Sequence, residues 1–110
     1  MVDTTEKPEQ NGPLLQISKT DRFEAWFLSL RDRMAQRRIQ ARIDRLSFGN
    51  AGQGRALTGG VSEMKIDVGP GYRIYYTQRG GLLIVLLCGG DKSTQVDDIK
   101  IALKMALELE

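Results

Sequence analysis

Apolar residues in the first half of the chain recur at the spacing of an α-helix. Two helical faces are predicted from residues three or four positions apart: Phe23, Trp26, Phe27 and Leu30, then Ala35, Ile39, Ile43 and Leu46. Ser18, Thr20 or Asp21 can cap the first helix, and residues 49–50 can end the second. A short apolar stretch at residues 14–17 precedes both. The pattern therefore predicts a strand followed by a helical hairpin.

Beyond the glycine-rich loop at residues 49–54, the pattern changes to the alternation and short apolar runs of strands. Three strands are predicted: one containing Val61, Met64, Ile66 and Val68, one over residues 72–78 and one over residues 82–87. Glycine turns at residues 69–71 and 80–81 join them into an antiparallel meander. The third strand is apolar on both faces, which predicts a central position. With a last helix from Ser93 or Thr94, the predicted order is β-α-α-β-β-β-α.

The length of 110 residues, with 41% hydrophobic and 27% charged residues, predicts one globular domain. Residues 1–12 are polar and aperiodic, so we expect a flexible tail before a domain covering residues 13–110. The longest apolar run, residues 82–88, is too short to cross a bilayer, and Asp3 and Glu6 do not suit a secretory signal. A cytoplasmic protein without a membrane partner is expected.

The absence of histidine and the single cysteine narrow the possible chemistry. Cys88 cannot form a disulfide within the chain, and the common zinc sites need more Cys or His ligands. Ser/His/Asp and Cys/His catalysis are excluded as well. The sequence therefore predicts no metal and no cofactor, and any proton transfer must use Lys, Arg, Tyr, Asp, Glu or the substrate itself.

Charge is unevenly distributed along the chain, although the net charge is only +2. Residues 19–55 contain nine basic residues against four acidic ones, which suits a polyanionic or an acidic protein partner. Four arginines fall on a predicted helical stripe about 60° wide: Arg31, Arg38, Arg42 and Arg45. The stripe is either a surface that follows phosphates or a solvated helix face whose long side chains cover apolar neighbours.

The two strands around the Gly-Pro-Gly turn place two cations together. Lys65 precedes the turn and Arg73 follows it, on the same predicted face of the sheet. Convergent cations can neutralise an RNA phosphate and stabilise the extra charge of a pentavalent transition state. The alternative is a cross-strand salt bridge to Glu63 or Asp67, on a face expected to display its charges. Alternation also puts Tyr75 on the Arg73 face.

The segment after the last predicted strand, residues 89–94, has a superficial likeness to a nucleotide-binding P-loop. That loop needs glycine immediately before its lysine, whereas Asp91 precedes Lys92 here. Lys92 is instead expected at the end of the strand, near the positive cluster. Ser93 and Thr94 are expected to cap the final helix.

Six segments carry a further signal: residues 23–26, 42–46, 49–50 and 61–63, the motif Gly-Pro-Gly-Tyr-Arg-Ile-Tyr-Tyr at 69–76, and Leu-Cys-Gly-Gly-Asp-Lys-Ser-Thr-Gln at 87–95. With these segments, the chain from Leu14 to Leu107 resembles the RelE/ParE superfamily of type II toxin-antitoxin toxins, and most closely its HigB-like addiction module killer proteins. The resemblance implies an α+β fold, with an N-terminal strand and a helical hairpin packed on an antiparallel sheet and a C-terminal helix.

The resemblance also implies the activity of an mRNA interferase, a toxin that cleaves mRNA, often on the translating ribosome. The RNA's own 2′-hydroxyl attacks in such enzymes, so neither a metal nor a covalent nucleophile is needed. Arg73 corresponds to the phosphate clamp, and Lys65 and Lys92 would support charge or move protons. The tyrosine that some relatives place in the final helix region is absent, since Val96 and Asp97 stand near there. The candidate RNA contacts are Arg55, Arg38, Arg42, Arg45 and Tyr75.

The implied partners are mRNA on the ribosome and a cognate antitoxin, commonly a HigA-like helix-turn-helix protein through which operator DNA would be bound. The antitoxin would cover the positive face or brace the helices with an acidic, partly disordered segment. Two alternatives stay open at this point. One is a ParE-like inhibitor of DNA gyrase that is not an enzyme, and the other is an inactive module that only binds its antitoxin.

Overall fold

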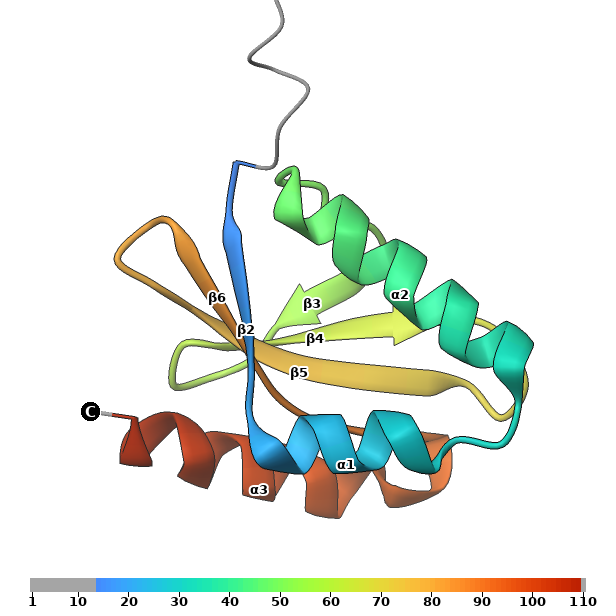
Figure 1. Cartoon of the computed structure of the whole chain (residues 1–110). Helices are drawn as coiled ribbons and strands as arrows, with labels where there is room; N and C mark the ends of the chain where they lie inside the picture. The colour runs from blue at the N-terminus through green and yellow to red at the C-terminus, as the bar shows by residue number, and fades with distance from the viewer. Residues whose placement is uncertain (1–13, 110) are drawn as a thin grey trace, which may run out of the picture.

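A five-stranded mixed sheet with helices on both faces organises the chain in a computed structural model, which describes residues 14–109 (Figure 1). The strand order is β2-β6-β5-β4-β3. The strands are β2 (Gln16–Lys19), β3 (Gly54–Ala56), β4 (Val61–Ile66), β5 (Tyr72–Arg79) and β6 (Leu83–Asp91). The predicted tail at residues 1–12 lies outside the described residues. The α+β class predicted from the sequence is confirmed.

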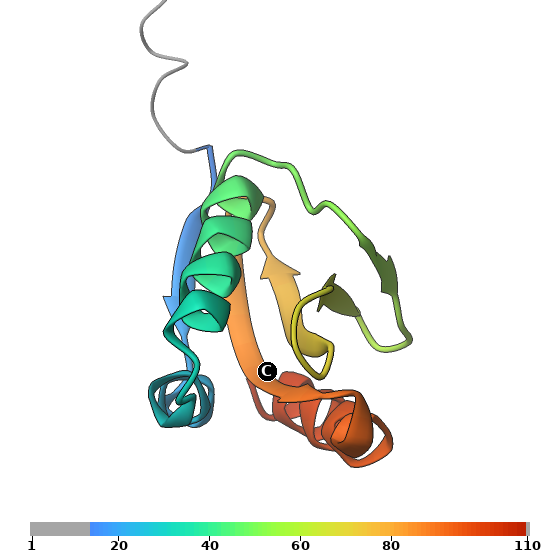
Figure 2. The ribbon, with the colours of Figure 1, turned by 90° about the vertical axis from the view of Figure 1, so that its right-hand side faces the viewer.

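The helices form two layers around this sheet. They are α1 (Asp21–Ser29), α2 (Arg33–Ser47) and α3 (Gln95–Glu108), which follows the short 3₁₀ helix η2 (Lys92–Thr94). Residues of α1 and α2 share one core with one face of the sheet, while α3 packs with the other face (Figure 2). None of the helices in residues 14–109 is long and apolar enough to span a membrane.

Side-chain caps fix where the first two helices begin. Thr20 Oγ1 accepts from the Phe23 amide at 3.0 Å and donates to the Leu87 carbonyl at 2.6 Å, which ties the start of α1 to β6. Asp32 caps α2 by accepting from the amides of Met34 and Ala35. The apolar face predicted for α2 is buried, and Phe23 of α1 is 0% exposed.

The sheet departs from the sequence prediction in two respects. β2 pairs with β6 in parallel, so the sheet is mixed and not antiparallel. β3 adds an unpredicted strand against β4, because its three exposed residues carry no apolar pattern that could indicate it. The expected central position of β6 is confirmed, since it lies between β2 and β5. The loop before it spans residues 80–82, one residue longer than predicted, because Arg79 pairs with Leu83.

Candidate functional site

The register of three strands brings the predicted cations to one face of the sheet. Lys65 of β4 lies directly opposite Arg73 of β5, and this register puts the two residues on the same face, as the sequence predicted. Arg55 of β3 lies opposite Glu63, which in turn lies opposite Tyr75. Because side chains alternate along a strand, these five residues share the face of the sheet that α3 covers.

These side chains surround a pocket of about 360 Å³ at the edge of the sheet. Its lining residues are Gln53, Gly54, Arg55, Glu63, Lys65, Arg73 and Gln95. Three of them are cationic and one is anionic, so the lining has an excess of positive charge. A small, polar, positively charged pocket of this kind suits an oxyanion such as a phosphate.

Glu63 is the carboxylate that interacts with Arg55, Arg73 and Gln95 in this pocket. Its Oε1 accepts from Arg55 Nε at 3.0 Å, and its Oε2 accepts from Gln95 Nε2 at 2.9 Å. The residue is 5% exposed. Burial alone would raise the pKa of Glu63, but the hydrogen bonds from Gln95 and Arg55 outweigh it and hold the pKa below its ordinary value. Glu63 is therefore ionised and buried, and the prediction that this face displays its charges is wrong at this residue.

Arg73 is a buried guanidinium held beside that carboxylate. It is 7% exposed, and its Nη1 donates to the Gly71 carbonyl at 3.1 Å. Its Nε lies 3.8 Å from Glu63 Oε2, which is an ion pair but too long for a hydrogen bond. Within residues 14–109 this buried Nε has no hydrogen-bond partner. Arg73 is therefore a fixed and largely buried positive charge in the wall of the pocket, and such a charge attracts an incoming anion.

Lys65 and Tyr75 lie on either side of this pair with different exposure. The Lys65 side chain is 35% exposed, and its Nζ is 3.9 Å from Asp67 Oδ1. Tyr75 is 0% exposed, and burial together with the neighbouring Glu63 carboxylate raises the pKa of Tyr75 far above its ordinary value. The predicted direct contact between Tyr75 and RNA is therefore corrected: this ring has no accessible face, and it lies opposite Glu63 in the sheet.

The other predicted site residues lie elsewhere. Lys92 is exposed in η2 and does not line the pocket of Arg73 and Lys65. Three arginines of α2 line a second hollow: Arg38, Arg42 and Arg45. Arg31 does not belong to their stripe, because α2 begins only at Arg33 after the Asp32 cap. It lines a third hollow with Arg33 and Arg37.

Two functional residues of the site were not recognised from the sequence. Glu63 was considered only as an alternative partner for the cations, and Gln95 was not considered at all. The available signal for Glu63 was an acidic residue two positions before Lys65, on the same face of the strand. Gln95 had no local signal, because it reaches Glu63 across 32 positions of sequence.

The described residues 14–109 contain no group of three or more Cys, His, Asp or Glu side chains that could hold a metal ion. The polar side chains that line the pocket are three cations, the buried carboxylate of Glu63 and the amides of Gln53 and Gln95.

Comparison with known proteins finds a close relative of this chain. A protein of Haemophilus influenzae, described as an uncharacterized protein, is 47% identical over 95 residues, which cover 86% of this chain and 96% of that protein. No family model matches the chain.

Proposed function

The chain belongs to the same family as this Haemophilus influenzae protein, and we propose that it is a RelE/ParE-superfamily toxin of the HigB-like branch, an endoribonuclease that cleaves mRNA. The observation that carries the proposal is the single pocket shared by Arg55, Lys65 and Arg73, in which a buried carboxylate orients two guanidinium groups. Preorganised cations in a partly buried site suit the charge that develops on a phosphate during transfer.

The reaction requires the RNA, fixed charges and a route for two proton transfers. The 2′-oxygen gives its proton to water or a basic side chain and attacks the adjacent phosphorus, the bond from phosphorus to the 5′-oxygen breaks, and that oxygen takes a proton from water or a protonated side chain. The products are a 2′,3′-cyclic phosphate and a 5′-hydroxyl end. Arg73 holds the phosphate and stabilises its added negative charge, and Lys65 supports that charge from the facing strand. Lys92, on exposed η2, remains a candidate for the proton transfers.

The partners belong to the same proposal. A cognate antitoxin, of the HigA-like helix-turn-helix kind, would neutralise the toxin and connect it to operator DNA. The N-terminal part of α2 supports this proposal, because Arg33 and Arg37 line a hollow there together with the exposed apolar side chain of Leu28, and an acidic amphipathic segment complements both. The substrate would be mRNA on the ribosome, which places the protein in the cytoplasm.

Primer extension on a defined mRNA in a bacterial translation extract tests this function. Wild-type protein is expected to produce new stops that depend on the ribosome. Arg73→Ala should reduce cleavage roughly 100-fold or more, the usual loss when one preorganised charge donor at a transition state is removed. Arg33→Ala is the matched control, since Arg33 is exposed and lines a different hollow.

One specific observation favours a second function: each cation of the pocket has an acidic neighbour. Arg55 and Arg73 both lie beside Glu63, and Lys65 lies beside Asp67. Such pairing suits a binding protein without catalysis, either a ParE-like gyrase inhibitor or a module that only docks on its antitoxin. An intact transcript in the presence of folded protein would refute the nuclease. A gyrase supercoiling assay and an antitoxin binding assay would then separate the two remaining functions.

A further inference from the structure

We propose that Arg38 and Arg45 of α2 form a second phosphate-binding subsite beside the Arg73 pocket, so that one RNA strand occupies both. This inference rests on the proposed function, because it names where the substrate continues beyond the reacting phosphate.

The second subsite is a separate hollow of about 360 Å³ between α2 and the end of β4. Its lining residues are Arg38, Ala41, Arg42, Arg45, Gln53, Ile66 and Asp67. Three cations face one carboxylate, and that carboxylate is already 3.9 Å from Lys65 Nζ. The hollow therefore has a surplus of positive charge that its own residues do not neutralise.

Arg42 is the fixed member of the three arginines. Its Nη1 donates to the Lys65 carbonyl at 2.7 Å, and its Nη2 donates to the carbonyls of Ala51 and Gln53 at 3.1 Å each. Gly52 permits this packing, since a Cβ there would lie 2.7 Å from Nη2. The prediction that Arg42 contacts RNA directly is therefore revised. Most of its N–H donors already bind backbone carbonyls, so its main contribution to the hollow is a fixed positive charge.

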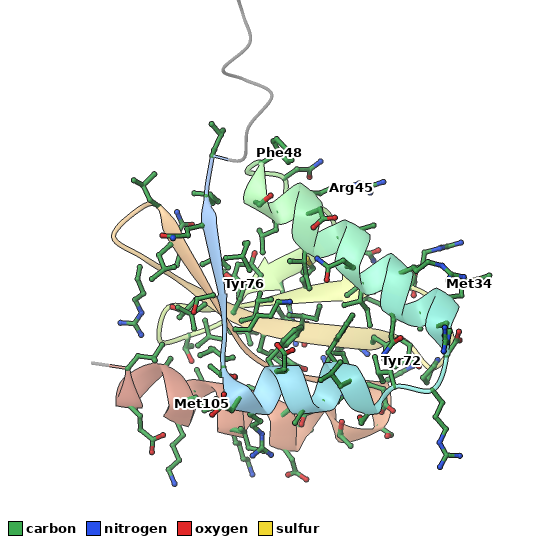
Figure 3. All side chains as sticks on the ribbon, in the orientation of Figure 1. Met34, Arg45, Phe48, Tyr72, Tyr76 and Met105 are labelled. Carbon is green, nitrogen blue, oxygen red and sulfur yellow. The ribbon has the colours of Figure 1, made fainter. Side chains whose placement is uncertain are left out.

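Arg45 and Arg38 are exposed and can close on an anion. Figure 3 shows Arg45 projecting from α2 near its C-terminal end. Burial lowers the pKa of Arg42, and the positive charge of Arg45 lowers it further. These like charges repel each other, and a phosphate placed between them would relieve the repulsion.

Gln53 joins the two subsites. It lines both hollows, and its carbonyl accepts from the Lys65 amide at 3.0 Å as well as from Arg42. The backbone of Lys65 is therefore held against the second subsite, while its side chain lines the first. The two hollows open on opposite faces of the sheet, so a polyanion that occupies both would pass around the β3 edge of the sheet, over Gln53.

The lining favours a nucleic acid strand over an acidic protein segment. An acidic amphipathic helix would need an apolar groove, and only Ala41 and Ile66 are apolar here. Exposed apolar side chains occur at both ends of α2: Leu28 is 65% and Met34 is 54% exposed near its start, and Phe48 is 47% exposed at its C-cap, but none of the three lines this hollow. Figure 3 shows Met34 and Phe48 at opposite ends of the helix. The second subsite has charge without that apolar surface, which is the composition expected for phosphate contacts.

Length-dependent binding tests the proposal with the full chain and 2′-O-methyl RNA, which lacks the attacking hydroxyl. Fluorescence anisotropy would compare oligomers of three and ten nucleotides over a salt series. Arg38→Gln/Arg45→Gln should weaken binding of the ten-mer but not the trimer, and should reduce the salt slope by about 1.4 for two lost phosphate contacts. The matched control is Arg33→Gln/Arg37→Gln, which removes the same charge from the same helix but from a different hollow.

The outcomes separate this inference from the nuclease. Equal loss in both double variants, or equal loss for both oligomers, would overturn the second subsite while leaving cleavage intact. Polyglutamate that competes as strongly as RNA, with the same dependence on Arg38 and Arg45, would assign the hollow to an acidic polypeptide instead. Length-dependent binding without cleavage of translated mRNA would support the subsite and refute the nuclease.

Discussion

Replacing Glu63 by Gln tests whether the buried carboxylate holds the site together. The substitution preserves the shape of the side chain but removes its charge. The oxygen of Gln can still accept one of the two hydrogen bonds, whereas its NH₂ group then faces the N–H of the other donor, Arg55 or Gln95. Arg73 keeps its charge and loses its anionic partner. We therefore expect a loss of stability dominated by Arg73.

The size of this loss follows from the exposure of each partner. The Arg55 side chain is 59% exposed, so its pair with Glu63 contributes at most about 1 kcal/mol. The Arg73 side chain is 9% exposed, and leaving a buried charge unpaired costs about 3 to 5 kcal/mol. The lower end applies because the two charged atoms are 3.8 Å apart. We expect a total loss of about 3 kcal/mol at pH 7.

The pH dependence gives a second signature. The pKa of Glu63 in the folded state lies below its ordinary value of 4.5, so the folded protein binds the proton less readily than the unfolded chain. The carboxylate therefore contributes its full stability above pH 4.5 and loses it as the pH falls through the folded pKa. The difference between wild type and Glu63→Gln should be largest at pH 7 and should shrink below pH 4.5.

Urea unfolding followed by circular dichroism, repeated from pH 7 to pH 3, measures both effects. Glu108→Gln is the control, since Glu108 is exposed at the end of α3 and should change stability by less than about 0.5 kcal/mol. A loss under about 1 kcal/mol at pH 7, or a difference that does not vary with pH, would refute the role given to Glu63.

Two further predictions concern the two cores. Phe23→Ala should lower the free energy of unfolding in urea by about 3 to 5 kcal/mol, because Phe23 is 0% exposed. Leu28→Ala on the same helix should lower it little, since Leu28 is 65% exposed, and equal losses for the two variants would contradict this packing. Burial and the charge of Asp98 raise the pKa of Cys88 to about 12, so at pH 8 its thiol should react with Ellman's reagent only after the protein unfolds. Rapid labelling of the folded protein would contradict this prediction.

Local periodicity was sufficient for most of the elements. The apolar spacing predicted α1 and α2, and burial of Ile39 and Ile43 confirms the face assigned to α2. The apolar character of residues 82–87 on both faces predicted a central strand, because only a strand covered on both sides needs it. These features depend on neighbours within a few positions of sequence.

The candidate site was predictable only where a short turn determined the geometry. The Gly-Pro-Gly turn and the alternation of side chains were enough to place Lys65 and Arg73 on the same face, whereas their direct pairing came from the register of the sheet. The same reasoning wrongly predicted that Tyr75 contacts RNA, because the alternation of side chains assigns a face of the sheet but not the depth of burial beneath α3. It also placed Lys92 near the positive cluster, whereas the structure does not place it among the residues lining the pocket.

The sequence by itself therefore determined the helices, the meander, the absence of histidine chemistry and the convergence of two cations. Only the tertiary structure decided the parallel pairing of β2 with β6, the addition of β3 and the burial of Glu63. Each of these depends on groups far apart in sequence, as when Gln95 of α3 reaches Glu63 of β4. The physical reason is that the burial and protonation of a charged side chain depend on its dielectric surroundings and its hydrogen-bond partners. Both come from chain segments that are far apart in sequence, so local patterns do not reveal them.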